Sequence, residues 1–280
     1  MMLYSISIIL RVAKMKQAIK KYWAERAKQH STSPSATTSD IYLRELEIST
    51  IIQTISNLPL PENASLLDVG CGDGYSTLKV AQEIEDLPFL GVDYSESMVN
   101  IACQRLETQP ELKRRVAFVV GDVMELDQVC GNSLYDVILG DRCLINIDSF
   151  ENQSYAMAQI AKHTKPGGWY IAIENFIEGN ENMNTARRQM RLTEIPVRWH
   201  NLYFNEHEFV QSLEPFFEDI MFKDFASSYY FATRVIYSSM CQMRGDHPDY
   251  NHEIHQLATR LPWIGQFSPV RMAVLRKKLT

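Results

Sequence analysis

Short apolar runs alternate with helical stretches through the middle of the chain. The apolar runs occupy residues 65–69, 88–92, 116–120, 135–139 and 169–173, and helical stretches lie between them at about 76–85, 95–107 and 151–163. Strands separated by helices in this rhythm predict βαβ units and a parallel sheet. The turn Lys165-Pro166-Gly167-Gly168 is typical of the boundary between a helix and the strand that follows it.

The N-terminal region has a different pattern. Residues 15–29 have helix-forming composition and a partly apolar stripe, and the Ser/Thr-rich stretch 30–40 predicts a loop. Asp40 is a suitable N-cap for a helix that runs to about residue 57. Residues 2–13 are apolar but far too short to span a bilayer, and they lack the features of a secretory signal. We therefore expect a frayed arm there.

The alternation ends after residue 175. Residues 177–212 look helical and irregular, 216–225 predict a strand, and 229–243 predict a helix. Residues 270–276 alternate between apolar and polar, as an edge strand would. The expected organisation is an N-terminal arm and helix (1–38) and one domain (39–280), divided into a core (39–176), cap segments (177–212 and 229–262) and a last strand (269–277).

Composition narrows the class of protein. The chain has 280 residues, of which 45% are hydrophobic and 22% charged, as in an ordinary globular protein. Its formal net charge of −6 argues against a general nucleic-acid binder, because a polyphosphate partner needs a basic face. The five cysteines are scattered and form no CxxC pair, which favours reduced thiols in the cytoplasm over a disulfide framework or a zinc ribbon.

The loop after the first apolar run is rich in glycine. It reads Asp68-Val69-Gly70-Cys71-Gly72-Asp73-Gly74-Tyr75, so the backbone turns sharply and a ligand can approach it closely. The dinucleotide fingerprint GxGxxG fails here, because the third glycine position holds Tyr75. Asp68 and Asp73 would repel a pyrophosphate, whereas they suit the cationic methionine end of S-adenosylmethionine. An acidic loop therefore favours S-adenosylmethionine over a dinucleotide.

Two further acidic positions follow in the expected order. Asp93 ends the second predicted strand, where a carboxylate can accept hydrogen bonds from both ribose hydroxyls. Asp122, in Gly121-Asp122-Val123, ends the third strand and could accept from the adenine amino group.

Together these motifs resemble those of class I S-adenosylmethionine-dependent methyltransferases. The resemblance rests on LLDVGCGDG, Asp93, GDV at 121 and KPGG at 165, and it covers roughly residues 39–176. It implies a Rossmann-like α/β fold with a seven-stranded, mostly parallel sheet, helices on both faces, a helical cap over the carboxyl edge and an antiparallel last strand. It also implies the residues that bind the cofactor, which are Asp68, Gly70, Cys71, Gly72, Asp93, Tyr94, Met98, Asp122, Val123 and Asp141. Later segments are similar to bacterial methyltransferases that modify small molecules or sugars.

The predicted chemistry is in-line displacement of a methyl group onto an oxygen or nitrogen of a small molecule, for which the enzyme mainly supplies alignment. A hydroxyl acceptor usually needs a general base, and an amine acceptor must only be neutral. His200 and Asp141 are the candidate catalytic residues, although His200 could equally be hydrogen-bonded within the cap. The candidate acceptor-binding residues are Arg142, Glu174, Trp199, Tyr203 and Tyr230.

Several alternatives remain open at this stage. Arg142 could bind an acceptor anion or pair with Asp141, and Arg44 could reach the cofactor carboxylate or pair with Glu45 or Glu47. The three histidines of HPDYNHEIH (247–255) lack a clear fourth ligand, so we expect no metal site. A methyltransferase acting on RNA or protein, or a non-catalytic binding module, are the rival functions. We expect no nucleic-acid partner and no stable membrane insertion, and the sequence leaves the oligomeric state undetermined.

Overall fold

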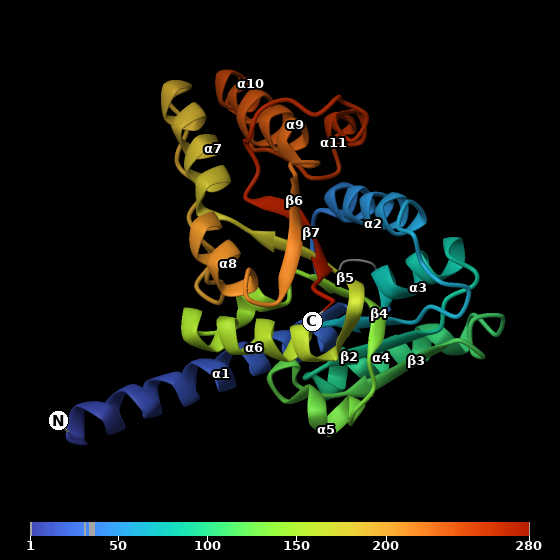
Figure 1. The fold of residues 1–280 in the computed structure, drawn as a ribbon. Helices are drawn as coiled ribbons and strands as arrows, with labels where there is room; N and C mark the ends of the chain where they lie inside the picture. Colours follow the sequence, from blue (N-terminus) through green and yellow to red (C-terminus); the bar gives the residue numbers. More distant parts are fainter. Residues whose placement is uncertain (1, 31, 34–36, 280) are drawn as a thin grey trace.

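The computed structural model describes residues 2–30, 32–33 and 37–279, and of residues 2–14 only the backbone. Its centre is a seven-stranded sheet in the order β3-β2-β1-β4-β5-β7-β6 (Figure 1). The strands are β1 (Leu66–Val69), β2 (Phe89–Asp93), β3 (Val116–Val120), β4 (Tyr135–Asp141), β5 (Thr164–Asn175), β6 (Phe217–Lys223) and β7 (Val270–Lys277). The predicted Rossmann-like fold and its seven-stranded, mostly parallel sheet are confirmed.

The strand directions explain the apolar runs in the sequence. β1 to β5 pair in parallel, so they are covered on both faces and need continuous apolar segments. β7 runs antiparallel to both of its neighbours, β5 and β6. The prediction of an edge strand for 270–276 is wrong: β7 lies inside the sheet with residues 270–275 all buried, and β6 forms the edge.

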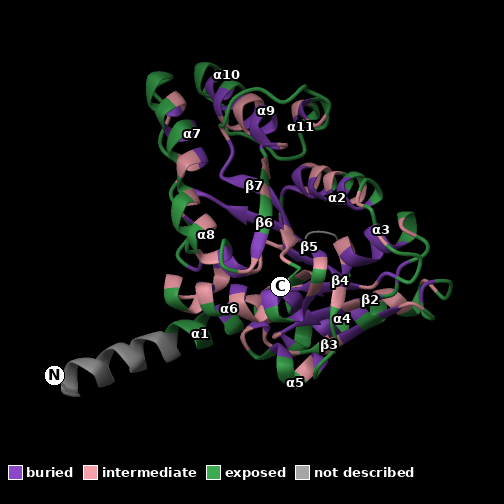
Figure 2. Ribbon diagram, in the orientation of Figure 1, coloured by how far each residue is buried: buried purple, intermediate pink, exposed green. Residues whose placement is uncertain are grey.

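Helices cover both faces of the sheet. Alternate residues of a strand point to opposite faces, so each strand contributes side chains to both layers of helices. Ile171 and Ile173 pack with α2 (Ile41–Ser56), α3 (Tyr75–Glu83) and α4 (Glu96–Glu107). Tyr170 and Ala172 of the same strand pack with α5 (Leu126–Cys130), α6 (Phe150–His163) and α8 (Glu206–Leu213). The purple interior of Figure 2 shows these two buried layers.

The segments after β5 form the cap. α7 (Ile177–Gln189), α9 (Ser227–Tyr230), α10 (Ser238–Arg244) and α11 (Glu253–Ala258) gather at one end of the molecule, and a π-helical segment, Phe231–Tyr237, joins α9 to α10 (Figure 1). Residues 190–205 are irregular except for a short bridge between Phe176 and Phe204. α8 packs on the sheet rather than in the cap, so the helical stretch 177–212 serves two layers.

Of three local predictions, two differ in detail from the structure. The N-terminal helix, α1, runs from Met2 to His30, whereas the sequence predicted a helix only from residue 15 and a frayed arm before it. Asp40 caps α2 as expected, since its side chain accepts from the Leu43 N–H. The KPGG turn lies within β5 as an irregularity, because the pairing with β4 shifts register there. None of the described helices has the length and apolar character needed to cross a membrane.

Candidate active site

The glycine loop after β1 is shaped by backbone conformations that side chains oppose. Gly70, Gly72 and Gly74 all have positive φ, of 74°, 53° and 70°. The Gly70 N–H donates to the Val92 carbonyl over 2.7 Å, and the Gly72 N–H donates to Asp93 Oδ2 over 3.0 Å. The loop is therefore tied to the end of β2, and its glycine backbone lines a cavity of about 300 Å³.

Buried carboxyl groups surround this loop. Asp68 lies in β1 one residue before its end, Asp93 and Asp141 end β2 and β4, and all three line the cavity. Burial raises the pKa of Asp68 to about 7, although its Oδ2 accepts from the Thr77 hydroxyl over 2.5 Å. Burial likewise raises the pKa of Asp93 to about 6 and raises that of Asp141. Oδ1 of Asp141 has no hydrogen-bond partner among the described residues. A cavity wall of this kind favours a cationic ligand.

Asp73, in contrast, plays a structural part. Its buried carboxylate pairs with Arg44 over 2.7 Å and with Arg105 over 2.9 Å, and it does not line the cavity. The sequence argument that Asp73 would repel a pyrophosphate is therefore wrong, and Asp68, Asp93 and Asp141 carry that argument instead. Arg44 lines the cavity from α2, with its recorded ion pair going to Asp73 rather than to Glu45 or Glu47.

A second cavity of about 270 Å³ adjoins the first, sharing Gly70, Asp93 and Tyr94 among its lining residues. Asp122 and Val123 line it at the end of β3. The Asp122 carboxylate caps the turn by accepting from the Met124 N–H over 3.0 Å. Asp68, Asp93 and Asp122 thus line the two cavities from β1, from β2 and from the end of β3; that they contact the methionine, ribose and adenine parts of the cofactor stays a prediction.

Helix α1 closes both cavities, which the sequence did not predict. Lys16 and Ile19 line the second cavity, and Lys16 pairs with Asp122 over 2.8 Å. Trp23 lines the first cavity and donates from Nε1 to Asn146 Oδ1 over 3.3 Å. Ala27 packs against α4. No local motif marks these residues, because their role comes from where α1 packs.

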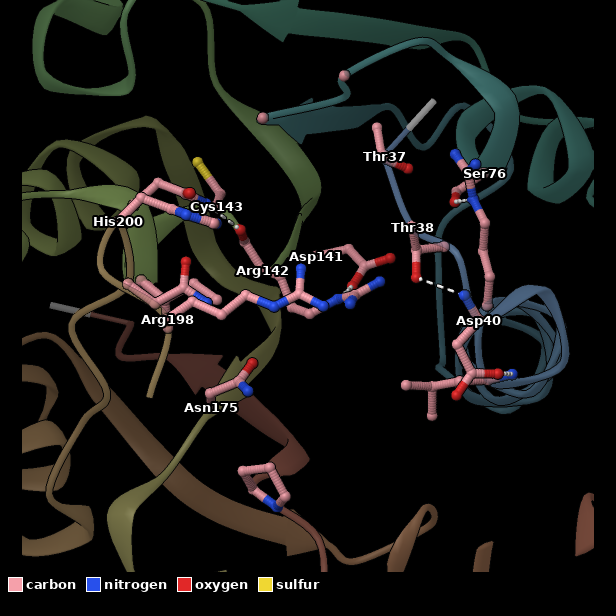
Figure 3. Close-up of a pocket in the computed structure, with 18 of the residues that line it drawn as sticks. Thr37, Thr38, Asp40, Ser76, Asp141, Arg142, Cys143, Asn175, Arg198 and His200 are labelled. Atoms are coloured by element: carbon pink, nitrogen blue, oxygen red, sulfur yellow. Dashed lines mark hydrogen bonds and ion pairs between the residues drawn. The ribbon is translucent and has the colours of Figure 1, made fainter. Parts of the chain in front are cut away.

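The other half of the first cavity lies beyond β4 and β5. Figure 3 shows Asp141 and Arg142 between Thr37, Thr38 and Asp40 on one side and Arg198, His200 and Asn175 on the other. Arg142 has a strained φ of 53°, and its guanidinium pairs with the buried Glu47 over 2.9 Å and lies 3.6 Å from Asp141. Tyr203 and Tyr230 also line this half.

His200 lies at the cavity wall in an aromatic enclosure. Its ring stacks on Tyr22 with centroids 4.5 Å apart, and Trp23 and Trp199 contact it edge-on. Burial, together with the nearby Arg198 charge, lowers the pKa of His200 to about 4, and Nδ1 has no described partner. The imidazole is therefore neutral at physiological pH.

The structure places other candidates away from the cavity. Glu174 is fully buried and accepts from the Leu144 and Ile145 N–H groups, which anchors the segment after β4. Trp199 is 57% exposed and supports His200 from outside. Of the three histidines near the C-terminus, His255 is buried and contacts the Tyr229 hydroxyl over 2.8 Å. The described residues contain no cluster suited to a metal ion.

Comparison with known proteins fits this geometry. Residues 60–208, more than half of the chain, match a protein family described as a methyltransferase domain. A demethylmenaquinone methyltransferase of Leptospira interrogans is 36% identical over 113 residues, which cover 39% of this chain and 42% of that protein. The chain thus matches less than half the length of this relative.

Two solved structures share the fold over most of the chain. The N-methyltransferase NodS from Bradyrhizobium japonicum, solved with S-adenosyl-L-homocysteine, has a TM-score of 0.56 at 13% identity, covering 92% of this chain and 98% of that one. Magnesium protoporphyrin IX methyltransferase from Synechocystis, also solved with S-adenosyl-L-homocysteine, has a TM-score of 0.53 at 14% identity, covering 84% and 83%.

The fold and the site are those of a class I S-adenosylmethionine-dependent methyltransferase. The chain belongs to the methyltransferase-domain family. Its cofactor is that of the class, S-adenosylmethionine, as the glycine loop predicted.

The residues present fit this cofactor. A Cβ at Gly72 would lie 3.2 Å from the Thr37 methyl group at a φ that side chains rarely adopt, so the glycine leaves room for a ligand. Asp68 and Asp141 can neutralise cationic groups, and the Asp93 oxygens can accept hydroxyls in addition to the Gly72 and Ser95 N–H groups. No described cation pairs with Asp68 or Asp93, which leaves both carboxylates available.

The raised carboxyl pKa values give a pH prediction. A cationic ligand favours the ionised forms, so it must lower the pKa values of Asp68 (about 7) and Asp93 (about 6), and binding then releases protons. Affinity should rise with pH up to about 7 and fall on acidification, by up to about tenfold per pH unit for each group. Calorimetric titration with S-adenosylhomocysteine between about pH 5.5 and pH 8 measures this. Asp68→Asn should bind more weakly at the alkaline end and flatten the profile, and a flat wild-type profile would contradict the assignment.

The contacts of α1 predict a sharp difference between two truncations. Deleting residues 1–14 should leave the affinity for S-adenosylhomocysteine within about twofold, because Lys16 is the first cavity contact of α1 among the described side chains. Deleting residues 1–30 removes Lys16, Ile19 and Trp23 and should weaken binding at least about tenfold. Equal affinities for the two truncated proteins, each shown folded by circular dichroism, would mean that α1 does not enclose the cofactor.

Proposed function

We propose that the chain transfers the methyl group of S-adenosylmethionine to an oxygen or nitrogen of a small molecule. One observation carries the proposal: the carboxylates of β1, β2 and β4 line the same cavity as the cap residues Arg198, His200 and Tyr230. Since this cavity of about 300 Å³ also takes part of the cofactor, the space left beside it suits a small acceptor more than a nucleic acid or a protein surface. The relatives named above act on small molecules, which supports the same choice.

The cofactor supplies an electrophilic methyl group on a sulfonium. The chain's own residues then have three tasks: to hold the acceptor in line, to exclude water and to accept a proton where the acceptor is a hydroxyl. The aromatic enclosure of Tyr22, Trp23 and His200 excludes water on one side, and Tyr203 and Tyr230 line the other.

Asp141 and His200 differ as proton acceptors. His200 has a pKa lowered to about 4, so it is neutral but holds a proton weakly. Burial raises the pKa of Asp141, and its Oδ1 lies in the cavity wall without a hydrogen-bond partner among the described residues. A carboxylate whose pKa is shifted toward neutrality is the better general base. We propose that Asp141 accepts the proton that a hydroxyl acceptor loses. His200 then makes a hydrogen bond that orients the acceptor.

The test is incorporation of label. The purified chain is incubated with S-adenosylmethionine labelled in the methyl group and with a metabolite extract from its own source, and labelled products are separated by size. Labelled small molecules support the proposal. Label found only in RNA or protein would favour the rival enzyme classes, and S-adenosylhomocysteine binding without any labelled product would favour a non-catalytic binding module.

We also expect a cytoplasmic location, in line with five free cysteines.

A further inference from the structure

One exposed cation of the cap, Arg198, lines the cavity without an ion-pair partner in the described structure. Arg198 lies in the irregular segment between α7 and α8 and lines the acceptor half of the first cavity. Within the described part of the chain, no hydrogen bond or ion pair is recorded for its guanidinium. Its charge nevertheless acts on the groups around it, since it helps to lower the pKa of His200.

The other charges of this half each have an opposite neighbour. Arg234 pairs with Asp40, and Arg142 pairs with Glu47. Asp141 lies 3.6 Å from Arg142 Nε. Arg198 is therefore the charge in excess. A guanidinium facing a cavity with low-dielectric walls is stabilised by an anion, and its planar fork matches a carboxylate or phosphate.

Arg142 and Arg198 extend into the same part of the cavity, as Figure 3 shows. Arg142 Nε makes no hydrogen bond in the described structure, but it faces Asp141 Oδ1 at 3.6 Å. Glu47 and Asp141 already balance the charge of Arg142, so Arg198 is the guanidinium in this space that an anion would pair with. The strained φ of 53° at Arg142 fixes this arrangement at the end of β4.

Neutral polar groups complete the site. Asn175 is 5% exposed, ends β5 and lines the cavity, and its Oδ1 has no described partner. Tyr203 lies close enough to Asn175, Arg198 and Arg142 for all three to lower the pKa of its hydroxyl, against the larger effect of burial. An unpartnered buried amide oxygen is a second and independent sign that a polar ligand belongs here; because it accepts, it would bind a hydroxyl or N–H of that ligand beside the anionic group.

We propose that the methyl acceptor carries a carboxylate or phosphate group, which Arg198 and Arg142 bind, at a position other than the atom that is methylated. The inference rests on the proposed function, whose acceptor class it specifies. The anion site lies beyond β4 and β5, whereas the predicted adenosine contacts lie at β2 and β3, so acceptor and cofactor occupy different ends of the site.

The charge of the methylated product tests the proposal. Label from S-adenosylmethionine is incorporated from the metabolite extract, and the small-molecule products are passed over an anion exchanger at neutral pH. Retained label supports an anionic acceptor, and phosphatase treatment distinguishes phosphate, which is released, from carboxylate, which is not. Label in the unretained fraction overturns the inference but leaves methyl transfer intact. Absence of any labelled product overturns the proposed function itself.

Variants then assign the anion to Arg198. Arg198→Met should lower the rate of labelling at limiting acceptor at least about tenfold, through KM rather than kcat, because the contact is made equally in the ground and transition states. Arg198→Lys should recover part of this loss. Arg260→Met, which removes an exposed arginine outside both cavities, should have no effect. The affinity of Arg198→Met for S-adenosylhomocysteine should stay within about twofold. A tenfold loss of that affinity would mean that Arg198 binds the cofactor's own carboxylate, which overturns the proposal.

Discussion

Replacing Gly72 with valine is expected to weaken the binding of S-adenosylhomocysteine at least about 100-fold, a loss of about 2.7 kcal/mol. Gly72 has φ of 53°, where a β-branched residue is strained, and its Cβ would lie 3.2 Å from the Thr37 methyl group. Any shift of the loop also disturbs the hydrogen bond from the Gly72 N–H to Asp93. The variant therefore affects the ligand space and the Asp93 carboxylate together.

Gly245→Val is the matched control. Gly245 ends α10 with φ of 77°, and nothing lies within 4 Å of its would-be Cβ. Both variants should lose roughly 1–2 kcal/mol of stability from the left-handed backbone. Calorimetry should show normal affinity for Gly245→Val alone. If the two variants bind S-adenosylhomocysteine equally well while folded, the loop after β1 is not the cofactor site.

The second large effect is expected at Asp141. With a hydroxyl acceptor, Asp141→Asn should lower the rate of product labelling about 10²–10⁴-fold at saturating cofactor, as expected for loss of a general base. With an amine acceptor the loss should be less than about tenfold, since a neutral amine needs no base. The measurement is the initial rate with the acceptor identified from the extract, together with the affinity for S-adenosylhomocysteine.

His200→Phe provides the comparison. Phenylalanine keeps the stacking on Tyr22 but removes the unpartnered Nδ1. We expect a loss of less than about tenfold, which corresponds to one orienting hydrogen bond. If His200→Phe loses most of its labelling rate while Asp141→Asn stays nearly active, His200 is the general base and Asp141 is not.

The sequence predicted the sheet well because parallel strands buried on both faces need unbroken apolar runs, which are visible locally. The carboxylates at Asp68, Asp93 and Asp122 were found for a related reason: the ends of such strands meet at one edge. Whether these residues bind the cofactor, and whether His200 and Asp141 act on the acceptor, are still predictions that the variants above would test.

Other features depend on tertiary packing and left no local pattern. The alternation in β7 suggested an edge, yet its polar member Arg271 is buried in ion pairs with Glu206 and Asp224. Asp73 looked like a ligand because its partners, Arg44 and Arg105, are distant in sequence. The contacts of Lys16 and Trp23 with the cavities likewise arise only when α1 packs beside α4.

The central claim is that the cavity along β1, β2 and β3 binds S-adenosylmethionine and not a dinucleotide. Parallel calorimetric titrations of the full chain with S-adenosylhomocysteine and with NAD⁺ test it most directly. The buried carboxylates Asp68, Asp93 and Asp141 predict saturable binding of S-adenosylhomocysteine and none of NAD⁺, whose pyrophosphate they repel. Binding of NAD⁺, or a lack of binding by S-adenosylhomocysteine to folded protein, would contradict the account.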